Sequence, residues 1–305
     1  MNTVSAPTTS AAPEPTRSGK PRHIGGLLAR ILIYLFLVFW AVVVIYPMAW
    51  TVISSLRTDR ELMFTPWGMP TQLHFENYLR AWTDAQIGQF FVNTLIVVIP
   101  SLFLTLLLSA MAAYVLARYE FRGKQFIRYL FMGGMMFPII LAMVPLYFIM
   151  EFLHLRNTFQ GLALVYVAFS FPFTVFFLYG FFRTLPRDLM EAAIIDGASH
   201  TQTFFQVMLP LAQPGLVTAA IFNFLGQWNQ FILPSALMDS TGLKEGQTRS
   251  VLSQGLYYLQ IKQQYTNDWS GMFAAVTIVM VPTLLVYVIF QNRIEKGLTV
   301  GALKG

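Results

Sequence analysis

The sequence predicts an all-α membrane protein with six transmembrane helices, and three observations lead to that prediction. Of the 305 residues, 56% are hydrophobic and only 11% are charged, whereas soluble domains are roughly 45–50% apolar and about 25% charged. Six uncharged runs are long enough to cross a hydrocarbon core about 30 Å thick, which takes roughly 20 helical residues. The net charge of +6 is spread over the short segments between these runs, unlike the basic face of a nucleic-acid-binding protein.

The predicted elements follow one another from the N-terminus. Residues 1–26 are rich in Ser, Thr and Pro, so we expect a disordered, cytoplasmic tail. The first apolar run is too long for the core of a signal peptide and shows no convincing small-residue cleavage site, which indicates a retained helix. One membrane domain, residues 27–292, and a C-terminal cytoplasmic tail, residues 293–305, complete the chain. The six spans are residues 31–55, 85–117, 129–150, 157–182, 211–238 and 269–292.

Basic residues indicate the orientation of these spans. An even number of spans places both termini on one side of the membrane. If that side is the cytoplasm, the cytoplasmic segments hold 13 Lys and Arg residues and the opposite segments hold 7. The positive-inside rule therefore predicts cytoplasmic termini in a cell membrane. Pro138, Pro145 and Pro172 are expected to kink the third and fourth spans.

The loop of residues 183–213, between the fourth and fifth spans, is predicted to form two short helices joined by a turn. Gly197 supplies the left-handed residue that commonly ends a helix. Ser199 or Thr201 can cap a second helix, which we expect Pro210 to end. One interpretation is an amphipathic hairpin on the membrane surface, and the other is an element that docks on a partner protein.

One pattern in this loop is specific. Glu-Ala-Ala is followed after three residues by Gly, and after nine more by an aliphatic residue, any residue and Leu-Pro. This pattern resembles the coupling-loop signature of ABC importer permeases, with Val where Ile is usual. The resemblance implies that the loop contacts an ATPase through Glu191, Ala192, Ala193, Asp196, Gly197, Val207, Leu209 and Pro210.

The resemblance covers nearly everything after residue 27. The segments that carry it are Phe91-Val92-Asn93-Thr94, Tyr114-Val115-Leu116-Ala117-Arg118 and the C-terminal Gly297-Leu298-Thr299-Val300-Gly301-Ala302-Leu303-Lys304-Gly305. They are similar to carbohydrate importer permeases of the maltose G-subunit type. The resemblance implies a second related permease, an extracytoplasmic sugar-binding protein and two cytoplasmic ATPase subunits as partners. It also implies that ATP and Mg²⁺ are bound by those ATPase subunits, and that the flexible C-terminal tail enters the ATPase dimer.

Several chemistries are missing from the sequence. It has no phosphate-binding G-x-x-x-x-G-K-[ST] motif, no cysteine and four scattered histidines, so neither ATP hydrolysis nor a metal site is expected. No catalytic triad or paired-carboxylate arrangement is recognisable. All six predicted spans lack charged residues in their cores, which argues against a proton-coupled carrier. We therefore expect a transport subunit rather than an enzyme, without a cofactor of its own.

Polar residues in the fifth span are the candidates for a sugar path. Asn223, Gln227 and Gln230 are spaced i, i+4 and i+7, which places them on one face of a helix. Trp228 lies at the same depth and can offer an apolar face to a sugar ring. Either these side chains line the path or they only join helices through hydrogen bonds, which are worth about 0.6 kcal/mol each.

The sequence leaves the transported solute open. Oligosaccharides, or amino sugars such as N-acetylglucosamine and chitobiose, are the substrates that the resemblance suggests. The alternatives are an ABC importer permease for a non-sugar solute and, further off, a self-sufficient channel or a membrane enzyme. The outer loop around Trp67 and Phe75 either contacts the binding protein or packs on its own chain.

Overall fold

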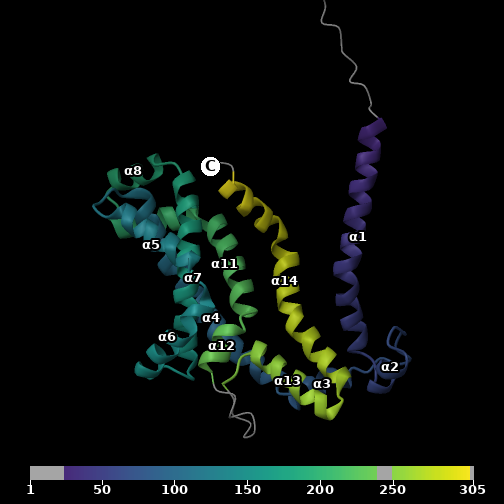
Figure 1. Ribbon diagram of the computed structural model, residues 1–305. Helices are drawn as coiled ribbons and strands as arrows, with labels where there is room; N and C mark the ends of the chain where they lie inside the picture. Colours follow the sequence, from purple (N-terminus) through teal and green to yellow (C-terminus); the bar gives the residue numbers. More distant parts are fainter. Residues whose placement is uncertain (1–23, 239–248, 303–305) are drawn as a thin grey trace, which may run out of the picture. The chain divides into compact units, whose positions relative to one another are not determined.

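The computed structural model describes residues 24–238 and 249–302, and every regular element in them is a helix (Figure 1). The chain divides into two units between Ala49 and Trp50. Residues 1–23 of the predicted tail lie outside the described residues, and residues 24–26 are already helical. The elements are α1 (Ile24–Ser54), α2 (Asp59–Phe64), α3 (Glu76–Thr83), α4 (Ile87–Arg118), α5 (Lys124–Met136), α6 (Ile139–Phe152), α7 (Phe159–Thr184), α8 (Asp188–Ile195), α9 (His200–Gln202), the π-helix η1 (Thr203–Met208), α10 (Leu209–Leu211), α11 (Gln213–Trp228), α12 (Ile232–Leu237), α13 (Leu252–Thr266) and α14 (Trp269–Ala302).

Helix α1 shows on its own why a membrane is required. Every side chain from residue 29 to residue 47 is exposed, and this stretch is almost entirely Leu, Ile, Val, Phe and other apolar residues. A helix that is apolar on all sides fits hydrocarbon and not water. Four of the described helices, α1, α4, α7 and α14, are long and apolar enough to cross a bilayer, or up to six spans if each of two bent helix pairs counts as one.

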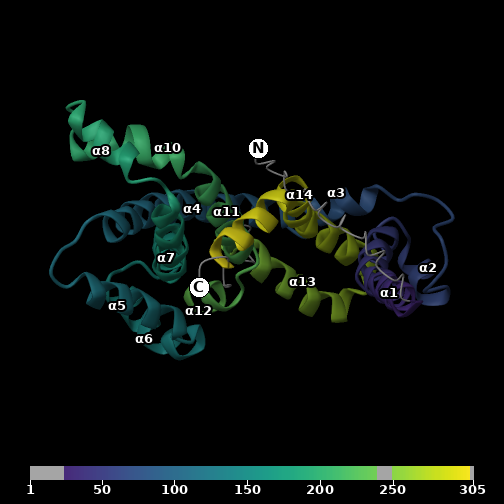
Figure 2. The ribbon, with the colours of Figure 1, turned by 90° about the horizontal axis from the view of Figure 1, so that it is seen from above.

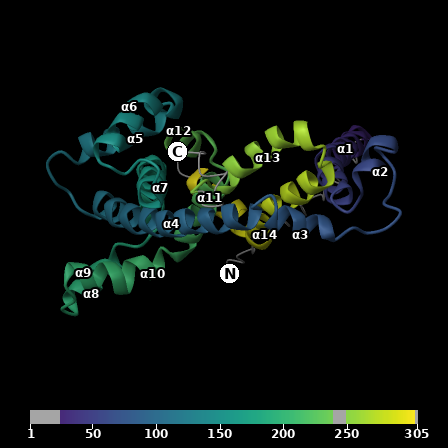
Figure 3. The ribbon, with the colours of Figure 1, turned by 90° about the horizontal axis from the view of Figure 1, so that it is seen from below.

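The second unit is built around α4 and α7, which pack along much of their length. Helix α11 contacts both of them and also α14 (Figure 1). Helices α5 and α6 lie on one side of α7 and α8 to α10 on the other, as Figures 2 and 3 show from opposite directions. The all-α membrane fold predicted from the sequence is confirmed.

The predicted third span is broken rather than kinked. Helices α5 and α6 meet at an angle of 102°, at Phe137 and Pro138. A residue that precedes proline is pushed out of the α conformation, and Phe137 is extended, with φ −78° and ψ 118°. The two helices have 13 and 14 residues, about 20 Å each at 1.5 Å per residue, so neither crosses a bilayer alone. Pro145 and Pro172 lie inside continuous helices.

The last two predicted spans also differ from the sequence-based boundaries. Helix α11 has 16 residues and ends at Trp228, and the short α12 follows it. Helix α14 runs on to Ala302, so the expectation of a flexible tail from residue 293 is wrong as far as residue 302. Gly297 and Gly301 lie inside the last part of α14. A single glycine destabilises a helix by only about 1 kcal/mol, so these two residues do not end it.

The bundle of the second unit has two distinct ends. The α8 end holds α8, the α4–α5 connection and the C-terminal end of α14 (Figure 1). The α3 end holds α2, α3, α12 and α13. These two names are used below, because each end carries a different candidate interaction surface.

Candidate functional site

The predicted helix-turn-helix at the α8 end is present. Helix α8 is followed by Gly197 with φ +86°, a conformation that side chains with a Cβ rarely adopt. Ser199 then caps α9: its hydroxyl accepts from the Gln202 backbone N–H, and the Gln202 side chain accepts from the Ser199 N–H. This reciprocal arrangement is a capping box. We call residues 188–211, from α8 to α10, the helical module.

The second helix ends at Leu211, one residue after the predicted end at Pro210. The segment widens into the π-helix η1, where the Leu209 N–H bonds to the Phe204 carbonyl, and Pro210 lies inside the next turn, α10. Proline breaks an α-helix because its ring meets the carbonyl four residues earlier. A π-turn pairs residues five apart, so the chain accommodates Pro210 inside the last helical turn, and α11 then follows at an angle of 74°.

The second half of the signature anchors the module to the bundle. Phe204 and Met208 are buried at 4% and 0% exposure, in a cluster with Tyr114 of α4 and Phe182 of α7. The Tyr114 ring packs against both phenylalanines, with centroid distances of 5.1 and 5.7 Å. The signature residues Val207 and Leu209 are half-buried against the same cluster. Close packing therefore joins the module to α4 and α7.

The first half of the signature faces outward. Glu191, Ala192, Asp196 and Gly197 are exposed, and Ala193 is half-buried. The apolar side chain of Ile195 is 84% exposed. Exposed apolar side chains gathered on a helix mark an interaction surface, and no residue that the structure describes covers them.

The C-terminal end of α4 holds both sides of the module. Arg118 is 8% exposed, and its Nη2 donates to the Leu185 carbonyl at 2.7 Å, just before α8. The Tyr119 hydroxyl lies 3.1 Å from Nδ1 of His200 in α9. The segment from Tyr114 to Arg118, which the sequence resemblance singles out, thus supports the module at its entrance and at its core.

A cavity of about 230 Å³ lies between α7 and α11, with further walls from the starts of α6 and α12. Its lining combines neutral polar side chains with the rings of Phe169, Phe173 and Phe222. None of the lining residues is charged. Within the described part of the chain, no three His, Asp or Glu side chains gather as a metal site would require.

The cavity brings together three of the four predicted path residues. Asn223, Gln227 and Gln230 all line it. The Asn223 amide donates to the Thr174 hydroxyl at 2.9 Å. Gln227 accepts from the Ser101 hydroxyl at 2.7 Å and donates to the Ser170 hydroxyl at 3.1 Å. Asn223 and Gln227 therefore join helices, as one of the two interpretations predicts, and they also form part of a cavity wall.

Trp228 is the exception among the predicted path residues. It is 2% exposed and does not line the cavity. Its indole N–H donates to the Val279 carbonyl of α14 at 3.3 Å, and its ring packs against Phe91 and Phe224. One step along a helix turns by about 100°, which carries Trp228 from the Gln227 face towards α14.

Sequence reasoning missed the cavity residues of α7. Tyr166 and Ser170 line the cavity opposite α11, and Thr174 holds the Asn223 amide. These three residues are spaced four apart, a polar line on one side of an otherwise apolar helix. That spacing is the signal that could have identified them.

At the α3 end, the Phe-Val-Asn-Thr segment of α4 holds the start of α13. Asn93 Nδ2 donates to the Ser250 carbonyl at 2.9 Å, and the Thr94 hydroxyl accepts from the Leu252 N–H at 2.8 Å. Gln254, at 1% exposure, donates to the carbonyls of Pro234 and Met238 at 3.2 and 3.3 Å. These buried bonds fix α12 and α13 beside the cavity.

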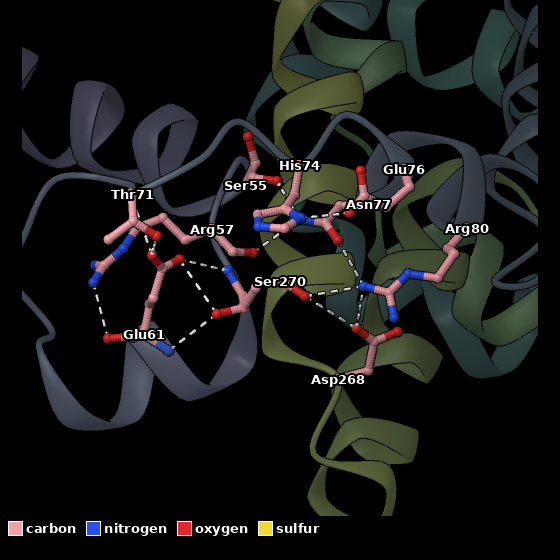
Figure 4. Close-up of polar contacts among 11 residues, drawn as sticks. Ser55, Arg57, Glu61, Thr71, His74, Glu76, Asn77, Arg80, Asp268 and Ser270 are labelled. Atoms are coloured by element: carbon pink, nitrogen blue, oxygen red, sulfur yellow. Dashed lines mark hydrogen bonds and ion pairs between the residues drawn. The ribbon is translucent and has the colours of Figure 1, made fainter.

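A polar network stiffens the loop of residues 57–84 at the same end (Figure 4). Arg57 is 1% exposed, and its guanidinium donates to the carbonyls of Glu61, Thr65 and Pro66 at 2.6 to 2.9 Å. Asn77 of α3 donates to the carbonyls of Ser55 and Arg57 at 2.9 Å. Arg57 thus joins three carbonyls of the α2 region to the end of α1 through one buried guanidinium.

The network extends from α3 to the start of α14. Arg80 donates to Asn77 Oδ1 at 2.7 Å and to the Ser270 hydroxyl at 3.1 Å. Its guanidinium also lies 3.4 Å from the Asp268 carboxylate. The loop of residues 57–84 is therefore held to the bundle and presents a defined surface, on which Trp67 and Phe75 are 73% and 64% exposed.

Glu61 gives this loop a pH dependence. Hydrogen bonds from the Thr71 hydroxyl, and then from the backbone N–H groups of Thr58 and Thr71, lower the pKa of Glu61 from 4.5 to about 2. A carboxyl whose pKa is lower in the folded chain stabilises the fold above its unfolded pKa. We expect the loop to be fully held above pH 4.5 and to loosen progressively between pH 4.5 and pH 2.

Hydrogen exchange at the Thr58 and Thr71 amides measures this loosening. Both N–H groups donate to the Glu61 carboxylate at 3.0 Å, so their exchange should accelerate as the pH falls through that window, once intrinsic rates are corrected. The Glu61→Gln variant should lose the pH dependence. An unchanged profile in that variant would show that another group is responsible.

Comparisons with known proteins place these features in context. The family described as "Binding-protein-dependent transport system inner membrane component" matches residues 105–300. That range includes the C-terminal part of α4, the helical module and the cavity helices α7 and α11.

Two relatives match almost the whole chain. The diacetylchitobiose uptake system permease protein NgcG of Streptomyces coelicolor is 49% identical, over 88% of this chain and 87% of its own. The trehalose/maltose transport system permease protein MalG of Thermococcus litoralis is 31% identical, over 92% of this chain and 98% of its own. A chain in the crystal structure of a bacterial ABC transporter involved in import of the acidic polysaccharide alginate has the same fold, with TM-score 0.74, 20% identity, and 88% and 97% of the two chains covered.

Proposed function

Because this chain belongs to the family of binding-protein-dependent transport system inner membrane components, we propose that it is a permease subunit of an ATP-driven sugar importer. The observation that supports the proposal most strongly is the combination, in one bundle, of an outward-facing helical module and a neutral polar cavity between spans. The cavity gives a solute a place within the bundle. The module gives a partner that hydrolyses ATP a place to act on it.

Sugar is the solute class that the relatives favour. One is named for diacetylchitobiose and another for trehalose and maltose. A sugar needs aromatic faces for its C–H surfaces and neutral donors and acceptors for its hydroxyls, and the cavity lining offers both. We therefore propose an oligosaccharide as substrate, with diacetylchitobiose as the first to test.

The helical module is the proposed contact for the ATPase subunit. Its outward half carries Glu191, Ala192 and Gly197, and its inward half is packed into α4 and α7. This places the α8 end in the cytoplasm, in agreement with the excess of Lys and Arg in the segments at that end. No ATP or Mg²⁺ site is assigned to this chain, because its partner supplies the hydrolysis in the proposed scheme.

The other partners follow from the same scheme. The α3 end then faces the outside of the cell. Trp67 and Phe75 are exposed there, in the loop that the hydrogen bonds of Arg57 and Asn77 hold together. We propose that this fixed aromatic surface contacts the sugar-binding protein. A second permease subunit would complete the path, because the cavity opens at the surface of this chain.

Reconstitution tests the proposal. Proteoliposomes that contain this chain, the second permease and the ATPase subunits should take up labelled diacetylchitobiose only when ATP is inside and the binding protein is outside. Uptake of a non-sugar solute alone, or sugar flux without ATP, would overturn the assignment. Vesicles that contain this chain without its partners are the control for a self-sufficient channel.

A further inference from the structure

The hydroxyl of Tyr166 is a polar group of the cavity lining that has no hydrogen-bond partner among the described residues. Tyr166 is 3% exposed and lines the cavity from α7, with its ring packed among Val165, Leu162 and Leu233. Its hydroxyl makes no hydrogen bond to any residue in the described part of the chain. Tyr166 is not among the residues with a fully enclosed polar atom that lacks a partner, so its hydroxyl is accessible from the cavity and can donate a hydrogen bond to a molecule in that space.

Two further donors surround the same space. Ser170 accepts from Gln227 Nε2, which leaves its own hydroxyl hydrogen available. Gln230 accepts from the Ile232 N–H through Oε1 at 3.1 Å, and its Nε2 group has no partner among the residues described. The Gln230 side chain therefore has its oxygen hydrogen-bonded and its amide N–H groups available.

The apolar part of the lining suits the faces of a sugar ring. Phe173 and Phe222 pack edge to face, with centroids 6.1 Å apart, and both line the cavity with Phe169. A cavity of about 230 Å³ is smaller than the roughly 300–1,000 Å³ of sites for drug-sized ligands. Its size fits one sugar ring rather than two, and its lack of charge fits hydroxyls rather than carboxylates.

We propose that this cavity is a binding site for a single ring of the transported sugar, with Tyr166 donating a hydrogen bond to one sugar hydroxyl. The inference rests on the proposed function and adds to it a contact residue from α7. Ser170 and Gln230 donate to other oxygens of the same ring. Asn223 and Gln227, whose amides are paired with α7 and α4, hold the walls at the correct separation.

Uptake of single-deoxy sugars by the complete importer tests the Tyr166 contact. In the unaltered importer, loss of the hydroxyl that Tyr166 binds should slow uptake roughly two- to tenfold relative to the parent sugar. In the Tyr166→Phe variant, which keeps the ring and loses only the hydroxyl, the ratio of parent to deoxy uptake should fall by that same factor for that one deoxy sugar. The preferences of the binding protein cancel, because the same binding protein serves both importers.

The Tyr257→Phe variant is the matched control, since Tyr257 lies on α13 outside the cavity. It should discriminate among the deoxy sugars as the unaltered importer does. Identical discrimination in Tyr166→Phe at every sugar position would overturn the inference. If Tyr166→Phe fails to assemble, Gln230→Met, which removes the free Nε2 donors, should erase discrimination at a different sugar position. An unaltered importer that carries no sugar would refute the proposed function instead.

Discussion

The Gly197→Pro variant should reach the membrane and yet lose ATP-dependent sugar uptake. Gly197 has φ +86° and its N–H bonds to the Ile194 carbonyl at 3.0 Å. Proline fixes φ near −65° and has no N–H, an incompatibility worth about 3 kcal/mol or more, which is a factor of roughly 100 in an equilibrium. The turn between α8 and α9 must then open, and the outward-facing half of the helical module loses its orientation. Uptake and stimulation of the ATPase by the binding protein should fall together by at least about tenfold.

Gly123→Pro is the matched control for this experiment. Gly123 has φ +88°, lies at the same end of the bundle at the start of α5, and has no atom within 4 Å of an added Cβ, as is also true of Gly197. The two variants thus introduce the same backbone conflict at sites with open surroundings. Equal losses in both would indicate general damage at the α8 end. Normal uptake in Gly197→Pro would refute docking through the module.

The Gly226→Leu variant should block transport without disturbing the fold. Gly226 lines the cavity on α11, and a Cβ added there meets nothing within 4 Å. A leucine side chain can therefore grow into the empty space and occupy the place of a sugar ring. Leucine also favours the helix by about 1 kcal/mol over glycine. We expect normal assembly, retained ATP hydrolysis and an uptake rate close to the background.

Gly180→Leu controls for the change of residue. Gly180 lies on α7 outside the cavity, is exposed, and also has no atom within 4 Å of an added Cβ. Uptake should stay near normal in that variant. If Gly226→Leu transports sugar as fast as Gly180→Leu, the solute does not pass through this cavity. If Gly226→Leu prevents assembly of the complex, it contradicts the open space that the structure shows.

Periodicity and local motifs account for what the sequence could predict. Long apolar runs locate α4, α7 and α14, because a helix that crosses the bilayer core must be long and apolar and both properties are visible in the sequence. The helix end at Gly197 and the cap at Ser199 could be predicted because helix ends depend on the backbone conformation and caps of single residues. A polar face in the fifth span could be predicted, because large amides are unusual inside a span and helical spacing puts Asn223, Gln227 and Gln230 on one side of the helix.

The remaining features depend on neighbours that one segment does not reveal. Tyr166 resembles any aromatic residue of a span until its hydroxyl is found unpaired beside a cavity. Trp228 has the chemistry of a sugar contact, but the packing of Phe91 and Phe224 fixes its direction towards α14. The break at Pro138 and the continuation through Pro210 show that the effect of a proline depends on whether the preceding turn can widen or must end.

Because none of the residues that line the cavity is charged, the cavity is an unfavourable place for an ion. An ion leaving water for this space would find dipoles and aromatic rings but no charged side chain of this chain among the lining residues, and such a transfer is strongly unfavourable. One elementary charge that crosses a membrane potential of 100 mV dissipates about 2.3 kcal/mol. The path proposed for this cavity would resist protons and sodium ions, so transport of a neutral sugar through it would conserve the membrane potential.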